Sequence, residues 1–199
     1  MISSHALPPR RIEATGLSCR RGERLLVGAL DLVVEPGEIV LLRGPNGAGK
    51  TTLLLTLAGV LRPAAGSVAI TGGAAGAGGD IHLLGHLSAV KARLSVRENL
   101  DFWTRLYAGN MALIGLALEA TGLEHLETLE AGHLSAGQVR RLALARLLCA
   151  DRPIWLMDEP ASSLDNEGEL LLGRLLDAHL LRGGLAIATT HHDLPLQPP

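Results

Sequence analysis

The chain has 199 residues, enough for one domain with a sizeable core, and 47% of them are hydrophobic. The single Phe, single Tyr and two Trp favour helices packed on a sheet over an aromatic-rich sandwich. A formal net charge of −2 provides no global field for nucleic acid or an anionic membrane, so we expect no nucleic-acid partner. No stretch approaches the ~18 continuous apolar residues of a membrane span, and MISSHALPPRR lacks the apolar core of a secretory signal. Cys19 and Cys149 match no metal or redox spacing and are expected to be buried, reduced thiols.

The first half of the chain is predicted to contain most of the strands. Short apolar runs of strand character occur at Ile12–Leu17, Leu25–Val34, Ile39–Arg43, Ser67–Thr71 and Ile81–Leu84. Glu35-Pro36-Gly37 predicts a turn before the third strand, and residues 50–61, KTTLLLTLAGVL, have helical character. The low-complexity stretch GGAAGAGG, residues 72–79, is expected to form a flexible surface loop.

The second half of the chain alternates helices and strands. Helical spacing occurs at Ser95–Leu106, Ala112–Thr121, Ala136–Cys149 and Glu167–Leu181. Ile154–Met157 is a continuous apolar run, as expected of a strand buried on both faces, and Leu185–Thr190 is the last predicted strand. The alternation predicts an α/β fold, with a parallel sheet and crossover helices, in a single domain spanning residues 1–199.

The motif GPNGAGKT fits G-x-x-x-x-G-K-[ST] and lies between a predicted strand and a predicted helix, the context that a phosphate-binding loop requires. Its residues are Gly44, Pro45, Asn46, Gly47, Ala48, Gly49, Lys50 and Thr51. Backbone N–H groups of such a loop point at phosphate oxygens, and the helix N-terminus adds a favourable dipole. Lys50 can reach the β- and γ-phosphates, Thr51 can coordinate Mg²⁺, and Thr52 can help to hold the α-phosphate. The alternative is a glycine-rich turn with a chance lysine, but sequence and context together indicate a nucleoside triphosphate site.

Two adjacent carboxylates, Asp158 and Glu159, follow the buried strand in the segment IWLMDEP. Beside a phosphate loop, the first carboxylate is expected to hold Mg²⁺ and the second to act as general base or to orient the attacking water. Alone, such a pair is more often a solvated helix cap. The loop at 44–51 favours the functional interpretation.

The segment LSAGQVRRLALARLL, which starts at Leu134, resembles the LSGGQ signature of ATP-binding-cassette (ABC) ATPases, with Ala136 in place of the first glycine. In this family, Ser135 and the backbone around Gly137 bind the γ-phosphate of ATP held by the opposite subunit. The resemblance therefore implies a head-to-tail homodimer around ATP and Mg²⁺. Ser135 as an ordinary N-cap of a helix is the alternative, and both interpretations are compatible.

Further segments resemble the family in the same order along the chain. ASSLD, residues 161–165, resembles the D-loop, with Asp165 at the subunit contact. His191 in TTHH resembles the switch histidine that senses the γ-phosphate, with His192 as the alternative. The resemblance spans about residues 12–193 and implies a P-loop NTPase fold of ABC type. This fold has a mainly parallel sheet, an N-terminal antiparallel β subdomain and a helical signature subdomain at about residues 95–150.

His86 occupies the place where this family usually carries a catalytic-site glutamine that contacts Mg²⁺ and water. A neutral histidine offers one donor and one acceptor at similar reach, but a protonated ring would repel Mg²⁺. The alternative is that His86 is a neutral replacement in some other transporter. This Gly-His pair, the LSAGQ with its double Arg, and the chain length resemble the CcmA family, the ATPases of the bacterial haem exporter for cytochrome c maturation.

The CcmA resemblance implies a peripheral protein on the cytoplasmic face of the inner membrane. Its implied partners are integral membrane subunits and, indirectly, a periplasmic haem chaperone, and an ATPase for another transported substrate is the alternative. In this family, adenine usually stacks on an aromatic residue of the first hairpin, which resembles LSCRRGER here. No aromatic residue is present there, so the resemblance implies that Arg20 or Arg21 stacks on the base instead. The remaining histidines are interpreted as surface or core-edge residues: His5, His82, His125, His133 and His179. A DNA- or ribosome-associated cassette protein, a small-molecule kinase and a GTPase fit the motifs less well.

Overall fold

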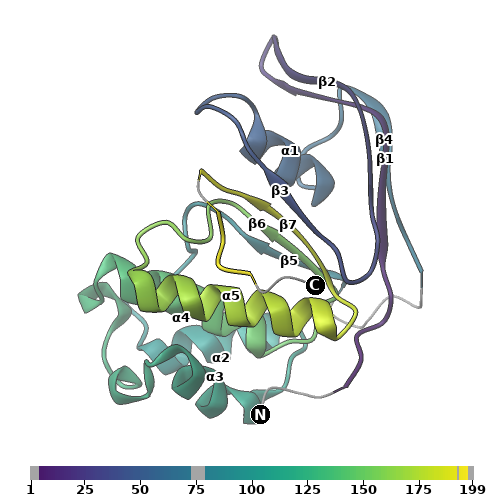
Figure 1. The fold of residues 1–199 in the computed structure, drawn as a ribbon. Coiled ribbons are helices and arrows are strands. Elements are labelled where there is room, and N and C mark those ends of the chain that lie inside the picture. Colours follow the sequence, from purple (N-terminus) through teal and green to yellow (C-terminus); the bar gives the residue numbers. More distant parts are fainter. Residues whose placement is uncertain (1–4, 73–78, 192, 197–199) are drawn as a thin grey trace.

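One antiparallel and one parallel β-sheet form the framework of the computed structural model, which describes residues 5–72, 79–191 and 193–196 (Figure 1). The antiparallel sheet has the order β2-β1-β4, from β1 (Arg11–Arg21), β2 (Arg24–Val34) and β4 (Ala65–Thr71). The parallel sheet has the order β3-β7-β6-β5, from β3 (Ile39–Leu42), β5 (Ile81–Leu84), β6 (Ile154–Met157) and β7 (Leu185–Thr189). This arrangement confirms the predicted α/β fold with a parallel sheet and an N-terminal antiparallel sheet.

Five α-helices connect these strands: α1 (Lys50–Leu57), α2 (Val96–Leu106), α3 (Ile114–Thr121), α4 (Ala136–Leu148) and α5 (Asn166–Leu181). Short 3₁₀ turns lie at Met111–Leu113, Glu124–Leu126 and Ala131–His133. The helix expected over residues 50–61 ends earlier, because Gly59 takes a left-handed φ of +72° just after the cap residue Ala58. The expected loop at 72–79 falls largely on residues 73–78, which lie outside the described part of the chain.

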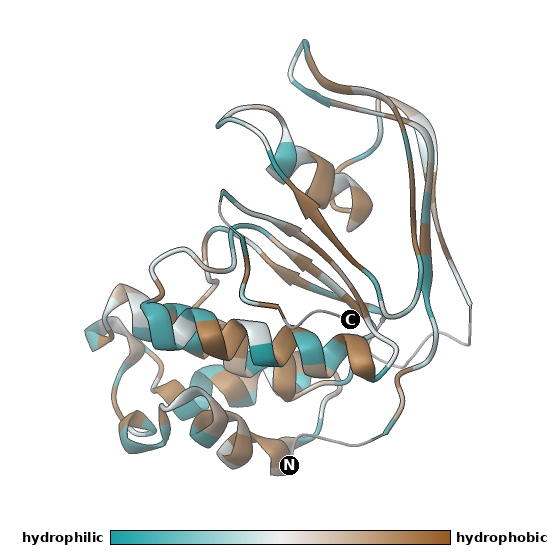
Figure 2. Ribbon diagram, viewed as in Figure 1, coloured by the Kyte–Doolittle hydropathy of each residue, from teal (hydrophilic) through white to brown (hydrophobic). Residues whose placement is uncertain are grey.

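Two apolar layers lie on opposite faces of the parallel sheet. Helix α1 lies between the two sheets, where Leu53, Leu54 and Leu57 pack with Ile12 of β1 and Ile187 of β7. On the other face, helices α2 to α5 cover the sheet, and the central strands are largely apolar in Figure 2. The strands β6 and β7 are buried along their whole length, which explains their continuous apolar sequences.

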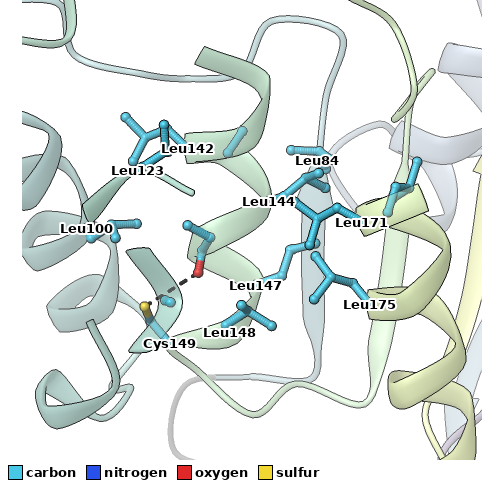
Figure 3. Packing of buried hydrophobic residues seen from close by; sticks show 14 of the residues in the cluster. Leu84, Leu100, Leu123, Leu142, Leu144, Leu147, Leu148, Cys149, Leu171 and Leu175 are labelled. Carbon is cyan, nitrogen blue, oxygen red and sulfur yellow. Dashed lines mark hydrogen bonds between the residues drawn. The ribbon is translucent and has the colours of Figure 1, made fainter. Parts of the chain in front are cut away.

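Helix α4 lies at the centre of the helical layer. Figure 3 shows Leu144 and Leu147 of α4 beside Leu171 and Leu175 of α5. At the end of α4, the Cys149 thiol is buried and contacts the Ala145 carbonyl, and burial raises its pKa to about 11. Cys19 is buried as well, so the prediction of buried free thiols is confirmed. No helix in the described ranges combines the length and apolarity that crossing a bilayer requires.

His82 and His179 are buried, which corrects the expectation that the scattered histidines are surface or core-edge residues. The His82 side chain on β5 is fully buried, with Nε2 3.0 Å from the Ala150 carbonyl oxygen, and burial lowers its pKa to about 3. The His179 ring stacks on Trp155 at 3.9 Å between ring centroids, and burial lowers its pKa to about 4. His5, His125 and His133 are exposed, as expected.

Candidate active site

Most of the predicted site residues follow the carboxyl ends of the four parallel strands. The phosphate loop follows β3, His86 follows β5, Asp158 and Glu159 follow β6, and His191 follows β7. Because all three strand pairs are parallel, these four connections leave the sheet at the same edge. The topology therefore gathers segments that are far apart in the sequence.

The loop between β3 and α1 has a backbone that only glycine adopts readily. Gly47 has a φ of +80° and Gly49 a φ of +99°, both in the left-handed region. A Cβ atom on Gly49 would lie 2.7 Å from the Cβ of Leu26, so the loop also approaches β2 too closely for a side chain. The ammonium of Lys50 turns back over the loop and donates to the carbonyl oxygens of Gly44 at 2.6 Å and Pro45 at 3.2 Å. The loop thus presents backbone N–H groups and one cation to the same space.

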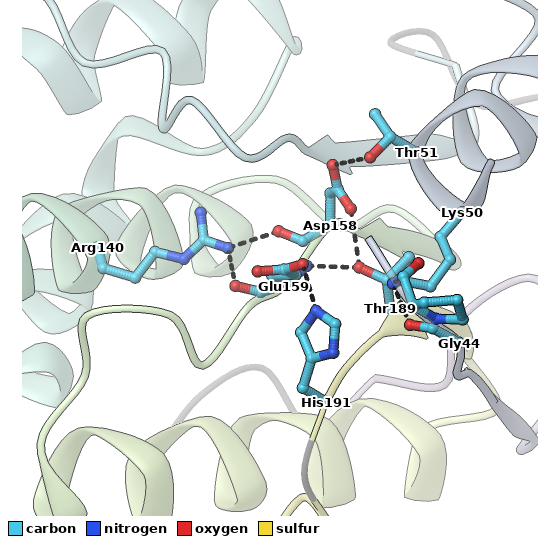
Figure 4. Close-up of polar contacts among 9 residues, drawn as sticks. Gly44, Lys50, Thr51, Arg140, Asp158, Glu159, Thr189 and His191 are labelled. Atoms are coloured by element: carbon cyan, nitrogen blue, oxygen red, sulfur yellow. Dashed lines mark hydrogen bonds and ion pairs between the residues drawn. The ribbon is translucent and has the colours of Figure 1, made fainter. Parts of the chain in front are cut away.

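A chain of hydrogen bonds joins the phosphate loop to the carboxylates after β6 (Figure 4). The Thr51 hydroxyl donates to Asp158 Oδ2 at 2.7 Å, and the Thr189 hydroxyl donates to Asp158 Oδ1 at 2.8 Å. The backbone N–H of Glu159 in turn donates to the Thr189 hydroxyl at 2.8 Å. Asp158 is only 4% exposed, so these bonds fix both oxygens of its carboxylate. Sequence reasoning missed Thr189, whose only signal is a hydroxyl at the end of an otherwise apolar strand.

Glu159 lies beside His191. The imidazole Nε2 of His191 is 3.0 Å from Glu159 Oε1, and the side chains remain 37% and 30% exposed respectively. Glu159 has a φ of +49°, an uncommon conformation for a residue with a side chain. The alternative histidine, His192, lies outside the described residues. The carboxylate is therefore held in place but still open to a water molecule.

An open hollow in front of the phosphate loop brings the loop together with Glu159 and with residues of the β1–β2 hairpin. It is lined by Arg21, Arg24, Leu26, Asn46, Gly47, Ala48, Gly49, Lys50, Thr51, Thr52 and Glu159. Of the two arginines expected near adenine, Arg21 lines the hollow and Arg20 does not. Sequence reasoning did not predict that Arg24 and Leu26 line this hollow. Arg24 lies opposite Arg21 across the hairpin, and Leu26 lies two residues further along β2, where alternate residues share a face.

The oxygen atoms of Thr51 and Asp158 form the place in this site that suits a divalent cation. Mg²⁺ prefers oxygen ligands and is usually held through one or two carboxylates, substrate phosphates and water. Within the described ranges, no group of three or more His, Cys, Asp and Glu side chains gathers to hold a metal. The residues present therefore fit a cation that takes most of its ligands from a bound nucleotide and water.

The signature segment forms a second polar hollow at the N-terminus of α4. Ser135 caps this helix, since its hydroxyl accepts from Gln138 N–H at 3.2 Å while Gln138 Oε1 accepts from Ser135 N–H at 2.9 Å. The first-turn N–H groups of Ala136 and Gly137 have no acceptor within a helix. A Cβ on Gly137 would lie 3.0 Å from the Ser163 carbonyl oxygen, so glycine lets the D-loop segment approach.

The two hollows are separate in the described chain. The second is lined by Gly122, Leu123, Ser135, Gly137, Gln138, Arg141, Ser163 and Asp165, none of which lines the first. Asp165 caps α5 by accepting from Gly168 N–H, and it also pairs with Arg141 at 2.7 Å. The signature segment of one chain therefore does not contribute to the phosphate hollow of that same chain.

His86 lies near the carboxyl edge of the sheet but away from the phosphate hollow. It is exposed, follows Gly85 at the end of β5, and precedes Leu87, which is 84% exposed. Within the part of the chain that the structure describes, His86 is not among the residues that line the phosphate hollow. Its proposed role therefore depends on a rearrangement or on a nucleotide that reaches toward it.

Comparison with known proteins identifies the family. The chain matches the ABC transporter family model over residues 27–162. It is 48% identical over 185 residues to the cytochrome c biogenesis ATP-binding export protein CcmA of Rhodopseudomonas palustris (strain BisB5), with 92% of each chain covered. It is 45% identical over 191 residues to CcmA of Rhizobium meliloti, again with 92% coverage of each chain. A solved putative ABC transporter ATP-binding protein from Pyrococcus furiosus shares 27% identity at a TM-score of 0.79, with 93% of each chain covered. The chain therefore belongs to the CcmA family of ABC transporter ATPases.

Proposed function

We propose that this ATPase drives the exporter of cytochrome c maturation; its relatives are named cytochrome c biogenesis ATP-binding export proteins, which supports the proposal. Its work would be haem delivery to, or release from, a periplasmic haem chaperone. The observation that supports ATP hydrolysis best is the Glu159 carboxylate, which lines the phosphate hollow and lies 3.0 Å from His191. An ATPase that serves a transporter for another substrate would have the same site.

The predicted site residues in and beside the phosphate hollow have proposed tasks. Lys50 and the N–H groups of residues 44–49 bind the phosphates, assisted by Thr52, while Arg21 lies under the base. Thr51 and Asp158 hold Mg²⁺, which when bound neutralises phosphate charge. Glu159 accepts a proton from the attacking water, and His191 orients the Glu159 carboxylate. Because the Thr189 hydroxyl bonds to both the Asp158 carboxylate and the Glu159 backbone N–H, it fixes the positions of these two residues relative to each other.

Two chains are proposed to assemble head to tail around two ATP molecules. The separation of the phosphate hollow from the signature hollow supports this arrangement, because each chain holds two incomplete halves. A two-fold axis would bring Ser135 and Gly137 of each chain to the γ-phosphate held by the other. The free N–H groups at the start of α4 would then bind an anion.

The proposed location is the cytoplasmic face of the bacterial inner membrane, where the chain would bind integral membrane subunits peripherally. The exposed segment after β5, with His86 and Leu87, is the proposed link between those subunits and the site. His86 would take the place of the family's glutamine beside water and Mg²⁺.

The exporter assignment is tested in a bacterial strain that lacks its own copy of this protein. Plasmid-borne wild-type chain should restore haem attachment to c-type cytochromes and co-purify with membrane subunits, whereas Glu159→Gln should co-purify without restoring attachment. Normal haem attachment without the protein, together with co-purification of an unrelated permease, would favour the transporter of another substrate.

A further inference from the structure

Three arginines cover the outer edge of the parallel sheet. Strand β5 is the edge strand. The carbonyls of Asp80, just before β5, and of Leu84, at its end, accept from the N–H groups of Ile154 and Asp158 along β6, so the carbonyls at the alternate positions point outward. These outward carbonyls accept hydrogen bonds from arginine side chains spaced six residues apart: Ile81 from Arg152 at 2.7 Å, Leu83 from Arg146 at 3.1 Å and Gly85 from Arg140 at 3.0 Å. Arginines thus satisfy the backbone groups that an edge strand leaves unpaired.

Arg140 differs from the other two because it also reaches the catalytic segment (Figure 4). Its Nη2 donates to the carbonyl oxygens of Asp158 at 2.8 Å and Glu159 at 2.5 Å, and its Nε donates to Pro160 at 3.0 Å. The residue is only 2% exposed. Burial lowers the pKa of its guanidinium to about 10, so the group stays charged at neutral pH and its hydrogen bonds are charge-assisted.

The segment that Arg140 holds contains Glu159, one of the described non-glycine residues with a positive φ. Glu159 has a φ of +49°, and a non-glycine residue persists in this region only where its surroundings hold it. Arg140 binds the carbonyl before this residue, its own carbonyl and the one after it. Thr189 holds its N–H from the opposite side. Without Arg140, three carbonyls lose the donor that fixes their direction, and the Glu159 side chain can turn away.

We propose that Arg140 is a positioning residue for hydrolysis: it fixes the backbone of Glu159 and joins it to the signature helix α4 and to the carbonyl of Gly85, next to His86. The inference rests on the proposed role of Glu159 as the group that receives the proton. Arg140 lies five residues after Ser135 on α4, so one side chain connects the signature hollow with the carboxylate of the phosphate hollow. A shift of α4 against the sheet would therefore reach Glu159 directly.

The matched control is Arg146, on the same helix. It is 3% exposed, donates to the Leu83 carbonyl of β5 and lies over the Trp103 ring at 4.6 Å from the centroid, but in the described chain it makes no hydrogen bond to residues 158–160. Both substitutions, Arg140→Gln and Arg146→Gln, remove a buried cation from α4 and the donor to one outward carbonyl of the sheet edge, Gly85 and Leu83 respectively. Only the first removes the donors around Glu159.

The test compares the full chain with these variants by thermal unfolding, ATP binding and ATP turnover per bound site. Arg140→Gln should bind ATP within about twofold of wild type and lose about tenfold to a hundredfold in kcat. Arg146→Gln should unfold at a lower temperature but keep its kcat. Arg140→Lys keeps the charge but lacks the planar guanidinium, so its kcat should also be lower than that of wild type. If Arg140→Gln does not fold, Arg140→Lys is compared with wild type in its place.

The variant Glu159→Gln distinguishes a failure of the positioning role of Arg140 from a failure of the catalytic role of Glu159. If Glu159→Gln abolishes turnover while Arg140→Gln and Arg140→Lys keep wild-type kcat, the positioning role is wrong and the catalytic role stands. Equal losses of kcat in Arg140→Gln and Arg146→Gln would also overturn the positioning role, in favour of general loosening. If Glu159→Gln itself turns over normally, the proposed role of Glu159 fails first.

Discussion

The Nε2 atom of His191 lies 3.0 Å from Oε1 of Glu159, across the adjacent ends of β7 and β6. A carboxylate only accepts, so Nε2 must carry a hydrogen for this contact to be a hydrogen bond. A histidine in that form orients the carboxylate without removing its ability to take a proton from water. This relationship links the end of the chain's last strand to the proposed chemistry.

Replacing His191 should impair turnover and spare binding. His191→Ala removes the contact to Glu159, and we expect kcat to fall by about a hundredfold, in the usual range for a positioned acid–base group. His191→Gln, which retains a donor, should recover part of the loss. ATP hydrolysis and ATP binding measured in parallel check this, and unaltered kcat in His191→Ala would exclude the orienting role.

Replacing Lys50 should impair binding itself. Lys50→Ala removes the cation that turns back over the phosphate loop, and losing a charge-assisted contact of ~1.5–3 kcal/mol should weaken ATP binding about tenfold to a hundredfold. Lys91→Ala is the control, because Lys91 lies over the Phe102 ring and does not line the phosphate hollow. Equilibrium binding of a fluorescent ATP analogue measures the difference. Equal affinities for the two variants would contradict the assignment.

If two chains share each ATP, hydrolysis depends on association. The rate per chain should rise with protein concentration in dilute solution, and Ser135→Arg should suppress it because the large side chain fills the exposed start of α4. Binding of ATP should be unchanged. Ser67→Arg, at an exposed position on β4, is the control. A rate per chain that stays constant on dilution would instead indicate a self-contained site.

The proposed role of His86 predicts that ATP turnover in the assembled complex depends on its side chain. His86→Gln restores the amide that the family usually carries and should keep substantial activity, whereas His86→Ala should lower partner-stimulated hydrolysis more than ATP binding. The measurement is the ATPase rate with the membrane subunits present. Identical rates for wild type and His86→Ala would make His86 a loop residue only.

Stability should depend on pH through the buried histidines. The pKa of His82 is lowered to about 3 and that of His179 to about 4, so below about pH 6.5 the unfolded chain binds protons that the folded chain does not. The free energy of unfolding should therefore fall as the pH is lowered, by ~1.4 kcal/mol per pH unit for each such histidine. Above that range these histidines contribute no pH dependence.

Urea unfolding between about pH 6 and 4.5 tests this account of His82. His82→Phe keeps an aromatic ring against Tyr107. It should reduce the slope of unfolding free energy against pH by the amount that corresponds to about one bound proton, whatever the stability of the variant at pH 7. His133→Gln, at an exposed position, should leave the slope unchanged. Parallel curves for wild type and His82→Phe would show that His82 does not titrate on unfolding.

Local patterns in the sequence predicted most of the fold. Continuous apolar runs located β6 and β7, and the glycines and lysine of residues 44–51 located the phosphate loop because local backbone geometry demands them. Thr189 and Arg140 were missed because their partners lie 31 and 18 residues away, and only the strand order, for Thr189, and the packing of α4 on the sheet, for Arg140, bring them together. The burial of His82 was not predicted, although His82 lies two residues before the buried Leu84 on β5 and therefore on the same face of the strand.

The most direct test of the account is ATP turnover by Glu159→Gln at saturating Mg²⁺ and ATP, normalised to bound ATP. The amide has the shape of the carboxylate but cannot accept the proton from water. We expect ATP binding to persist, turnover to fall by at least about a hundredfold, and an ATP-bound dimer to accumulate. Turnover at the wild-type rate would contradict the account, because no other carboxylate lines the phosphate hollow in the described chain.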